Sequence, residues 1–489
     1  MRIFLIFFSI LLLSACTKDK FNTADQSQYP ADVSAIVVNT CATAGCHNTQ
    51  SAVNANDLDF STWDNMFKGG KNGSSVIPYS VDYSFALYFM NTDPNLGLSL
   101  LPRMPYNRTP LSTSDYLTIR NWIANGAPDK NGFVKFSDDP NRKKFYVCMQ
   151  SCNQVAVFDA ATRVIMRYVK VGDGLGGPHD IEITPDGKYW ALAFINGDIV
   201  QFFYTTDDQL AGTVNIGAAP WNIITFTHDS KTAFVSSFAD PQQIAQIDVT
   251  TFSKTLTITG IANPHGLHVN SNDSILYATS QYGNYINKIY LKGFLQYSSD
   301  QIPLDQYPPY SSSGSNSEDP HQINFSPDES KYFVSCQNSN EVRILQTSND
   351  SLLAIVKVGV KPQEIVVSHN QPYLFVTCME DSVTWPGTDH GSVYRINYNT
   401  YEKLALHCGW QPHGIDVDDD HNLVYVANLN YSTTGPAPHH VSDCGGRNGY
   451  VSIIDMNTWN FLKVPLLNGL PYTYKNEVLA YPYEVAYRK

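Results

Sequence analysis

The segment Pro412-His413-Gly414-Ile415-Asp416-Val417 is one of seven similar segments in this chain. Each copy starts with a proline, and the third and fifth residues after it are apolar, except that Thr225 takes the fifth place in one copy. Alternation with a period of two residues is typical of a β-strand that is buried on one face. The other copies start at Pro178, Pro220, Pro264, Pro320, Pro362 and Pro482. Repetition of one strand predicts a repeat architecture.

Further strands follow most copies. A turn similar to Pro-Asp-Gly leads into a second strand, such as Lys331–Ser335 or Leu423–Ala427, and a third strand follows, such as Glu341–Leu345. Four strands in about 42 to 56 residues is the size of one β-propeller blade. The repeat resembles that of YVTN-type propellers over nearly all of residues 143–489. We therefore expect a mostly β protein, with a seven-bladed β-propeller over residues 144–489.

The two ends of the repeat region are complementary. The last copy stops at Lys489 after a single strand, whereas Lys144-Phe145-Tyr146-Val147 has a second-strand pattern with no first strand before it. We expect Pro482–Arg488 to pair with the strands of Phe145–Val171 and to close the ring through a composite blade. Closure removes exposed strand edges, which promote aggregation.

Composition agrees with a β-rich chain of more than one domain. The 489 residues are too many for a single ordinary core, and 30 Tyr and 24 Phe favour strands over long helices. The net charge of -13 provides no positive field for a phosphate backbone, so nucleic-acid binding is disfavoured.

The first residues have the pattern of an export signal. An apolar run over Ile3–Leu13 is too short to cross a bilayer. It leads into Leu13-Ser14-Ala15-Cys16, which resembles the lipobox of bacterial lipoproteins. This resemblance implies that residues 1–15 are removed and that Cys16 is acylated. The alternative is an ordinary signal peptide that is cleaved near Ala15.

Residues 30–130 differ in character and contain a set of haem ligands. Cys41 and Cys46 precede His47. A c-type haem needs two thiols that form thioethers, and a histidine directly after the second thiol that ligates the iron. Four residues separate these thiols instead of the usual two. Two alternatives remain: a disulfide beside a surface histidine, or a zinc site, for which no convincing fourth ligand lies nearby.

A methionine further along the chain favours haem. Met104 lies in Leu101-Pro102-Arg103-Met104-Pro105, where a turn would present its thioether as the sixth iron ligand. We prefer it to Met66 and Met90 for this role. In the alternative interpretation, Met104 fills the core.

A closing helix follows this turn. Ser112 or Ser114 can cap its start, Gly126 and Pro128 end it, and its expected buried residues are Leu117, Trp122 and Ile123. The C-x-x-x-x-C-H segment, the Met-Pro turn and the closing Trp-Ile-x-x-Gly-Ala resemble the cytochrome c-like domains of large exported bacterial proteins. The resemblance implies a small α-helical domain over residues 30–130 with a covalent c-type haem. Residues 131–143 would link it to the propeller.

Four of the repeated segments have a histidine after the proline, namely His179, His265, His321 and His413. First strands line the central channel of a propeller, so these imidazoles could converge. Nitrous oxide reductase is similar in having a seven-bladed propeller whose inward histidines hold copper, which implies copper as one alternative. The other three copies have Trp221, Gln363 and Tyr483 here, and we favour packed, hydrogen-bonded structural histidines. His439 and His440 would join a metal site only if their loop folds over the channel mouth.

The propeller cysteines suggest burial and disulfides. Cys148, Cys336 and Cys378 are placed at equivalent ends of second strands, where we expect small buried side chains. An exported protein can form disulfides, and the sequence suggests Cys148 with Cys152 or Cys408 with Cys444.

Three hypotheses of function follow. The first is a haem-binding electron-transfer lipoprotein of the cell envelope, periplasmic or surface-exposed, with residues 16–29 as a tether and the N-terminal lipid as its membrane contact. Its propeller would dock a redox partner protein or bind a ligand, with no reaction of its own. The second is a redox enzyme with a histidine-lined, copper-binding site at the propeller mouth that the haem feeds. The third is a non-catalytic binding scaffold.

Overall fold

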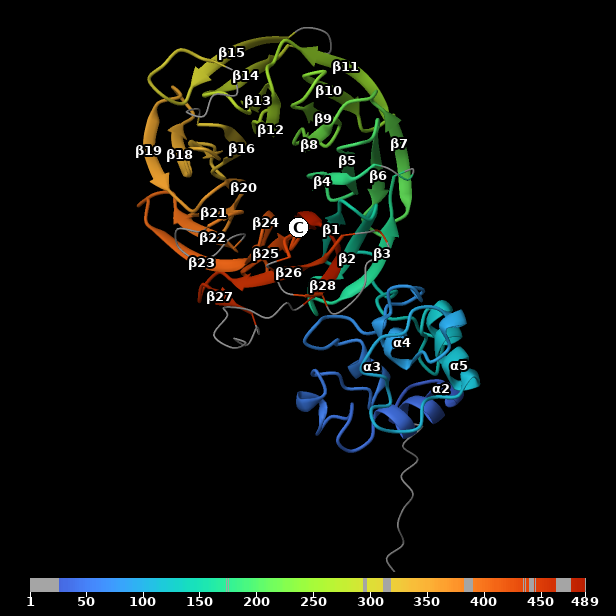
Figure 1. Cartoon of the computed structure of the whole chain (residues 1–489). Helices are drawn as coiled ribbons and strands as arrows, with labels where there is room; N and C mark the ends of the chain where they lie inside the picture. Colours follow the sequence, from blue (N-terminus) through green and yellow to red (C-terminus); the bar gives the residue numbers. More distant parts are fainter. Residues whose placement is uncertain are drawn as a thin grey trace, which may run out of the picture.

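Seven β-sheets surround a central axis in the computed structural model of this chain (Figure 1). The structure describes residues 26–488 except 173, 175, 293–296, 311–317, 382–389, 434, 436, 439–443, 445 and 463–475. The prediction of a mostly β chain with a seven-bladed propeller is confirmed.

Five sheets consist of four consecutive antiparallel strands, with the first strand at the axis and the fourth at the rim (Figure 1). In chain order these are β4 (Pro178–Ile183), β5 (Tyr189–Phe194), β6 (Ile199–Tyr204) and β7 (Leu210–Asn215); β8 (Trp221–Phe226), β9 (Thr232–Ser237), β10 (Gln243–Asp248) and β11 (Ser253–Thr259); β12 (Pro264–Val269), β13 (Ile275–Ser280), β14 (Tyr285–Leu291) and β15 (Tyr297–Pro303); β16 (Pro320–Phe325), β17 (Lys331–Cys336), β18 (Glu341–Gln346) and β19 (Leu352–Lys357); β20 (Pro362–Val367), β21 (Tyr373–Cys378), β22 (His390–Asn397) and β23 (Lys403–Trp410).

The sixth sheet departs from this pattern at its outer edge. It contains β24 (Pro412–Asp418), β25 (Leu423–Asn428) and β26 (Asn448–Asp455) in the usual order. Two short strands, β27 (Asn460–Phe461) and β28 (Glu477–Ala480), both pair with β26. The fourth strand of this blade is therefore divided between two segments.

The seventh sheet joins the two ends of the propeller region. Its inner strand is β29 (Pro482–Tyr487), which pairs antiparallel with β1 (Lys144–Met149). The sheet continues through β2 (Gln154–Asp159) and β3 (Ile165–Lys170). Val485 lies opposite Val147 in this register. The ring thus closes through a blade composed of both ends of the region.

The repeated segments form all seven inner strands, and their apolar residues form the core between blades. The third residue after each proline is buried in every copy: Ile181, Ile223, Leu267, Ile323, Ile365, Ile415 and Val485. Second strands such as β17 are buried over almost their whole length, because sheets pack on both of their faces. Rim strands such as β19 expose most of their residues.

A side-chain hydrogen bond repeats between neighbouring blades. The fifth residue of a second strand donates to the backbone carbonyl of the residue after the proline in the next inner strand, as Ser335 Oγ does to Gln363 at 2.6 Å. The same bond joins Ser236 to His265 (2.7 Å), Thr279 to His321 (2.9 Å) and Thr377 to His413 (2.7 Å). These bonds fix the residue after the proline in position.

The structure corrects the placement of one cysteine. Cys336 and Cys378 end their second strands, but in β1 it is Met149 that takes this place. Cys148 instead takes the place of the hydroxyl residues, and its Sγ lies 3.8 Å from the carbonyl of His179. All three thiols are fully buried, as expected.

Residues before the propeller form a small helical region at its rim (Figure 1). Its elements are α2 (Ala31–Ile36), a π-helical turn at Val37–Cys41, short 3₁₀ turns at Ala52–Asn54 and Pro94–Leu96, α3 (Trp63–Met66), α4 (Phe85–Met90) and α5 (Thr113–Ala124). The Ser112 hydroxyl caps α5 by accepting from Asp115 N at 3.1 Å. The buried face of α5 is Tyr116, Ile119, Trp122 and Ile123. The expected Leu117 is half-buried and packs at the edge of the same core, and Ile119 is fully buried within it.

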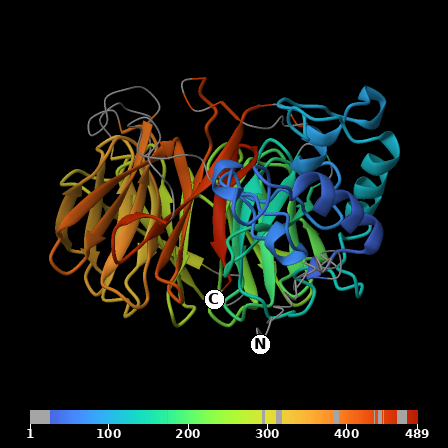
Figure 2. The same ribbon diagram turned by 90° about the horizontal axis from the view of Figure 1, so that it is seen from below.

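The helical region packs directly on the composite blade, as the edge view in Figure 2 shows. Tyr83 stacks at a tilt on Tyr168 of β3, with 4.8 Å between ring centroids. Ser74 Oγ donates to the carbonyl of Ile165 at 3.1 Å. One apolar cluster also includes Val164 and Met166 of the propeller together with helical residues such as Trp63. The two parts thus share a core.

A disulfide joins Cys152 to Cys444. Both pairings expected from the sequence are therefore wrong: Cys148 and Cys408 are free, buried thiols. The physical reason is that the loop after β1 and the segment before β26 meet at one edge of the propeller, which brings Cys152 and Cys444 together (Cα atoms 5.0 Å apart). Among the described residues, no helix is both long and apolar enough to span a membrane.

Candidate functional site

A tight turn brings Cys41, Cys46 and His47 to one side of the helical region. The π-helical turn ends at Cys41, and the backbone N–H of His47 donates to the Cys41 carbonyl at 3.1 Å. The N–H of Cys46 donates to the Thr43 carbonyl at 3.0 Å. The two thiols are free and half-buried.

These three residues line a cavity of about 840 Å³. Its size lies within the range of about 300–1,000 Å³ that is typical of ligand sites. Met104 lines the same cavity from a loop that a hydrogen bond from its own N–H to the Phe89 carbonyl (2.7 Å) ties to α4. Much of the remaining lining is apolar and includes Leu58, Phe60, Phe85, Ala86, Phe89, Met90 and Leu101.

The imidazole of His47 is held in an apolar environment. It stacks on Phe60 with 4.9 Å between ring centroids. Its Nδ1 is buried and has no hydrogen-bond partner among the described residues. Burial lowers the pKa of His47, although the backbone carbonyls of Leu58 and Ala55 act in the opposite direction. The neutral imidazole that results is the form that ligates metals.

Burial also acts on the nearby thiol. Burial, together with the neighbouring Cys46, raises the pKa of Cys41 to about 12. Cys41 is therefore a neutral thiol at physiological pH and a poor nucleophile for oxidants or disulfides.

The three methionines considered as sixth ligand differ in position. Met66 is buried in the core and does not line the cavity, whereas Met90 and Met104 both do. Arg108 of the loop after Met104 donates to the Thr43 hydroxyl at 3.1 Å. This bond ties the methionine loop to the cysteine loop.

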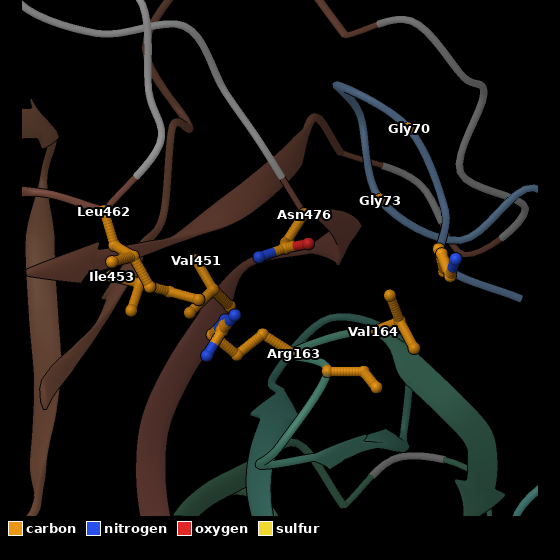
Figure 3. A pocket seen from close by; sticks show the side chains of 10 residues that line it. Gly70, Gly73, Arg163, Val164, Val451, Ile453, Leu462 and Asn476 are labelled. Atoms are coloured by element: carbon orange, nitrogen blue, oxygen red, sulfur yellow. The ribbon is translucent and has the colours of Figure 1, made fainter. Parts of the chain in front are cut away.

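A smaller cavity of about 120 Å³ lies between the helical region and the propeller (Figure 3). Arg163 reaches across it toward Val451 and Ile453, and Asn476 lies beside the turn at Gly70 and Gly73 (Figure 3). Its lining residues include no histidine, cysteine or carboxylate. We regard it as a packing gap rather than as a reactive site.

The four histidines of the inner strands converge on the propeller axis. The ring centroids of His265 and His321 are 4.0 Å apart, and those of His321 and His413 are 6.0 Å apart. Tyr483 lies between His179 and His413, at 4.2 and 3.9 Å. A register shift follows the proline in each of these inner strands, and such bulges redirect side chains.

Two of these histidines have hydrogen-bonding partners. Nδ1 of His179 lies 2.7 Å from Gln150 Nε2, and its Nε2 lies 3.4 Å from Asn222 Nδ2. Nδ1 of His265 lies 3.1 Å from the backbone carbonyl of His321. Both fit the structural role that we favoured from the sequence.

The other two histidines form a cluster with a glutamate. Neither ring nitrogen of His413 has a hydrogen-bond partner among the described residues, and the same is true of Nδ1 of His321 and Oε1 of Glu364. One ligand atom from each of the three residues lies within 4.8 Å of the others. Glu364 was not predicted from the sequence. It is the second residue after the proline, a position that varies between repeats. The other copies have Asp180, Asn222, Gly266, Gln322, Gly414 and Glu484 there.

Burial controls the protonation of this centre. Burial lowers the pKa of His265 to about 4. Burial and the neighbouring His265 lower the pKa of His413 to about 3, although the nearby Tyr483 carbonyl acts in the opposite direction. The imidazoles are therefore neutral at physiological pH. Burial raises the pKa values of the carboxyl groups of Asp180, Glu364 and Glu484.

Two glycines allow the inner strands to approach at this level. A Cβ atom on Gly414 would lie 2.4 Å from Glu484 Cα, and one on Gly266 would lie 2.5 Å from the His321 carbonyl oxygen. Both contacts are far shorter than van der Waals distances. The centre is therefore closely packed at the level of the histidines.

Other expected site residues fall outside the described structure. These are Cys16, His439 and His440.

Comparisons with known proteins support the fold alone. No family model and no curated protein matches this chain. Among solved structures, a functionally unknown protein from Desulfotomaculum acetoxidans DSM 771 is similar, with a TM-score of 0.50 and 15% identity over 69% of this chain and 99% of that chain. Kuenenia stuttgartiensis hydrazine synthase is also similar, with a TM-score of 0.49 and 14% identity over 65% of this chain and 91% of that chain. At such identities the likeness concerns architecture, so the function has to be argued from the sites.

Proposed function

We propose that this protein is an electron carrier whose helical region binds a c-type haem covalently through Cys41 and Cys46. The observation that carries the proposal is that two free thiols, the imidazole of His47 and the thioether of Met104 line one largely apolar cavity of about 840 Å³. These groups have the chemistry that attachment and axial ligation require.

The arrangement of the donors favours haem over a bound zinc ion. Among the described residues, the one group of three or more His, Cys, Asp or Glu side chains close enough to hold an ion lies at the propeller axis. Cys41, Cys46 and His47 therefore do not converge on one point. Haem needs ligands that are spread out in this way, because the thioethers form at the edge of the macrocycle and the histidine binds at its centre.

The haem would supply one-electron chemistry, and the chain would control its potential and access. His47 and Met104 would hold the iron, and a His/Met pair would raise the reduction potential and leave no open iron position for a substrate. The apolar lining would exclude water and favour the less charged iron state. The propeller would then act as a binding scaffold that docks a redox partner protein.

Spectroscopy of the denatured protein tests the proposal. Full-length protein matured with a working haem-attachment system should give a reduced α-band that survives denaturation. The variant with Cys41→Ser and Cys46→Ser should lose covalent haem, whereas the control His421→Gln, at a half-exposed propeller histidine, should keep it. Wild-type protein without covalent haem after such maturation would exclude the proposal.

Anchoring of the protein is a separate proposal. We propose that Cys16 is acylated and holds the protein at the cell envelope, on the basis of its lipobox-like sequence. Labelling with a fatty-acid analogue should mark the wild type and not Cys16→Ser, which should appear in the soluble fraction. Equal labelling of both would exclude this assignment.

A further inference from the structure

We propose that His321, Glu364 and His413 bind one divalent first-row transition-metal ion at the centre of the propeller. The inference is independent of the haem proposal, because it rests on a different part of the chain. Two imidazoles and one carboxylate are a donor set that such ions bind with an open position for water or a ligand.

The unpaired polar atoms are the first argument for a bound ion. All three side chains are at least nine-tenths buried, and Nδ1 of His321 and Oε1 of Glu364 have no hydrogen-bond partner among the described residues, their contact with each other being 3.5 Å long. Neither nitrogen of His413 makes a well-formed hydrogen bond to a described residue, although the Tyr483 carbonyl lies nearby. An unsatisfied buried polar atom costs about 1–3 kcal/mol. An ion would satisfy three such atoms at once.

The distances are the second argument. Nδ1 of His321 lies 3.5 Å from Oε1 of Glu364, and one ligand atom of His413 completes a group within 4.8 Å. Metal–ligand bonds of about 2.0–2.2 Å place two ligand atoms at most about 4.4 Å apart. The first pair already satisfies this limit, whereas a separation of 4.8 Å exceeds it by about 0.4 Å, so metal binding would have to draw the His413 ring in by about that distance.

Hydrogen bonds from neighbouring residues hold these donors in position, as is usual around metal ligands. Gln322 Nε2 donates to Oε2 of Glu364 at 2.6 Å, which leaves Oε1 free for an ion. The Thr377 hydroxyl accepts from the Glu364 N–H at 3.2 Å and donates to the His413 carbonyl at 2.7 Å, so it links the backbones of two ligands. His265 packs on His321 and contacts its carbonyl.

The other carboxylates at the axis are already engaged. Asp180 Oδ2 accepts from the N–H of Ile224 at 2.6 Å, and Glu484 Oε1 accepts from that of Ile415 at 3.0 Å. Glu484 Oε2 lies 3.9 Å from His413 Nδ1. Of these three carboxylates, Glu364 is the one with a buried oxygen, Oε1, that has no hydrogen-bond partner among the described residues.

Metal analysis of the full-length protein tests the site. Protein purified without chelators from cells supplied with manganese, iron, cobalt, copper and zinc should contain about one such ion per chain in addition to haem iron. The ligand variants are compared in protein that also carries Cys41→Ser and Cys46→Ser, so that haem iron does not contribute to the measured metal content. In this background, Glu364→Gln and His413→Gln should lower the metal content at least tenfold.

The control is His268→Gln, which lies on β12 beside His265 and stacks on Phe325 instead of facing the axis. This variant should keep its metal. Circular dichroism and an intact Cys152–Cys444 bond would show that each variant is folded. A second measurement keeps all three proposed ligands. Refolding the Cys41→Ser, Cys46→Ser protein with cobalt(II) should produce the visible d–d absorption of a protein-bound ion.

Two results would overturn the inference. One is less than about one-tenth of an ion per chain after native purification and also after refolding with zinc or cobalt. The other is full metal content in folded Glu364→Gln and His413→Gln. Copper, zinc or another first-row ion that is lost in both variants would support it.

Discussion

Cys152 is bonded to Cys444 although 292 residues separate them in the sequence. The bond holds the composite blade, in which the two ends of the propeller region close the ring, to the segment before β26. We predict that the variant with Cys152→Ser and Cys444→Ser loses about 2–4 kcal/mol of unfolding free energy, because a long covalent loop is opened in the unfolded state. Urea unfolding followed by fluorescence measures this loss.

A reductant provides the control for this prediction. It should lower the stability of the wild type to that of the Cys152→Ser, Cys444→Ser variant and leave the stability of that variant unchanged. Alkylation of both Cys152 and Cys444 in the unreduced native protein would show that the bond is not formed.

The second prediction concerns the packing of the inner strands. Gly414→Ala should destabilise the protein by about 3 kcal/mol, because the new methyl group would meet Glu484 Cα at 2.4 Å in the neighbouring inner strand. Gly187→Ala is the control, since a Cβ there meets no atom within 4 Å and only its positive φ of 69° opposes the change, at about 1 kcal/mol. Thermal unfolding measures both. Equal losses in the two variants would contradict the close approach of the strands.

The third prediction is a pH dependence that Glu341 causes. Burial alone would raise the pKa of Glu341, but hydrogen bonds from Lys357 and Arg343 and their positive charges outweigh it, so its pKa lies below the ordinary value of 4.5. A carboxyl group with a lowered pKa stabilises the fold above its unfolded pKa, and this contribution is lost as the pH falls through the folded pKa. Glu341→Gln should therefore cost about 3 kcal/mol at pH 7.

The difference between wild type and Glu341→Gln should shrink as the pH falls below about 4.5. Denaturant unfolding at several pH values measures it. Glu380→Gln, which breaks the more exposed pair with Lys361, should cost less than about 1 kcal/mol. A loss for Glu341→Gln that does not change with pH would contradict the assignment to its charge.

The fourth prediction separates the candidate axial methionines and rests on the haem proposal. Met104→Leu should lower the reduction potential of the bound haem, because a thioether ligand raises it. Met66→Leu should leave the potential nearly unchanged, since Met66 does not line the cavity. Redox titration followed by the α-band measures both. A lowered potential in Met90→Leu instead would assign the ligand to Met90.

Much of the propeller could be predicted because one strand recurs with its chemistry intact. The proline and the residues three and five places later identify the inner strands, and the incomplete first and last repeats indicate how the ring closes. The divided edge of the sixth sheet could not be predicted, since β27 has two residues and β28 four. Strands of this length carry too little periodicity to detect.

The sequence indicated the histidines of the central cluster but not its glutamate. Four histidines share one repeat position, so their convergence follows from the fold. Glu364 stands at a position that varies between blades and is Glu again only at Glu484, and its proximity to His321 and His413 depends on side-chain packing across three blades. The pairing of Cys152 with Cys444 likewise depends on which loops meet at one edge of the ring, and the local sequence does not indicate which loops these are.

The order of synthesis gives the composite blade a further meaning. β29 is made after every other strand of the propeller, and it brings Tyr483 and Glu484 to the axis as well as the partner for β1. The ring and its polar centre therefore cannot be complete before this strand has been synthesised. A nascent chain without this strand would have an open blade and an incomplete polar centre.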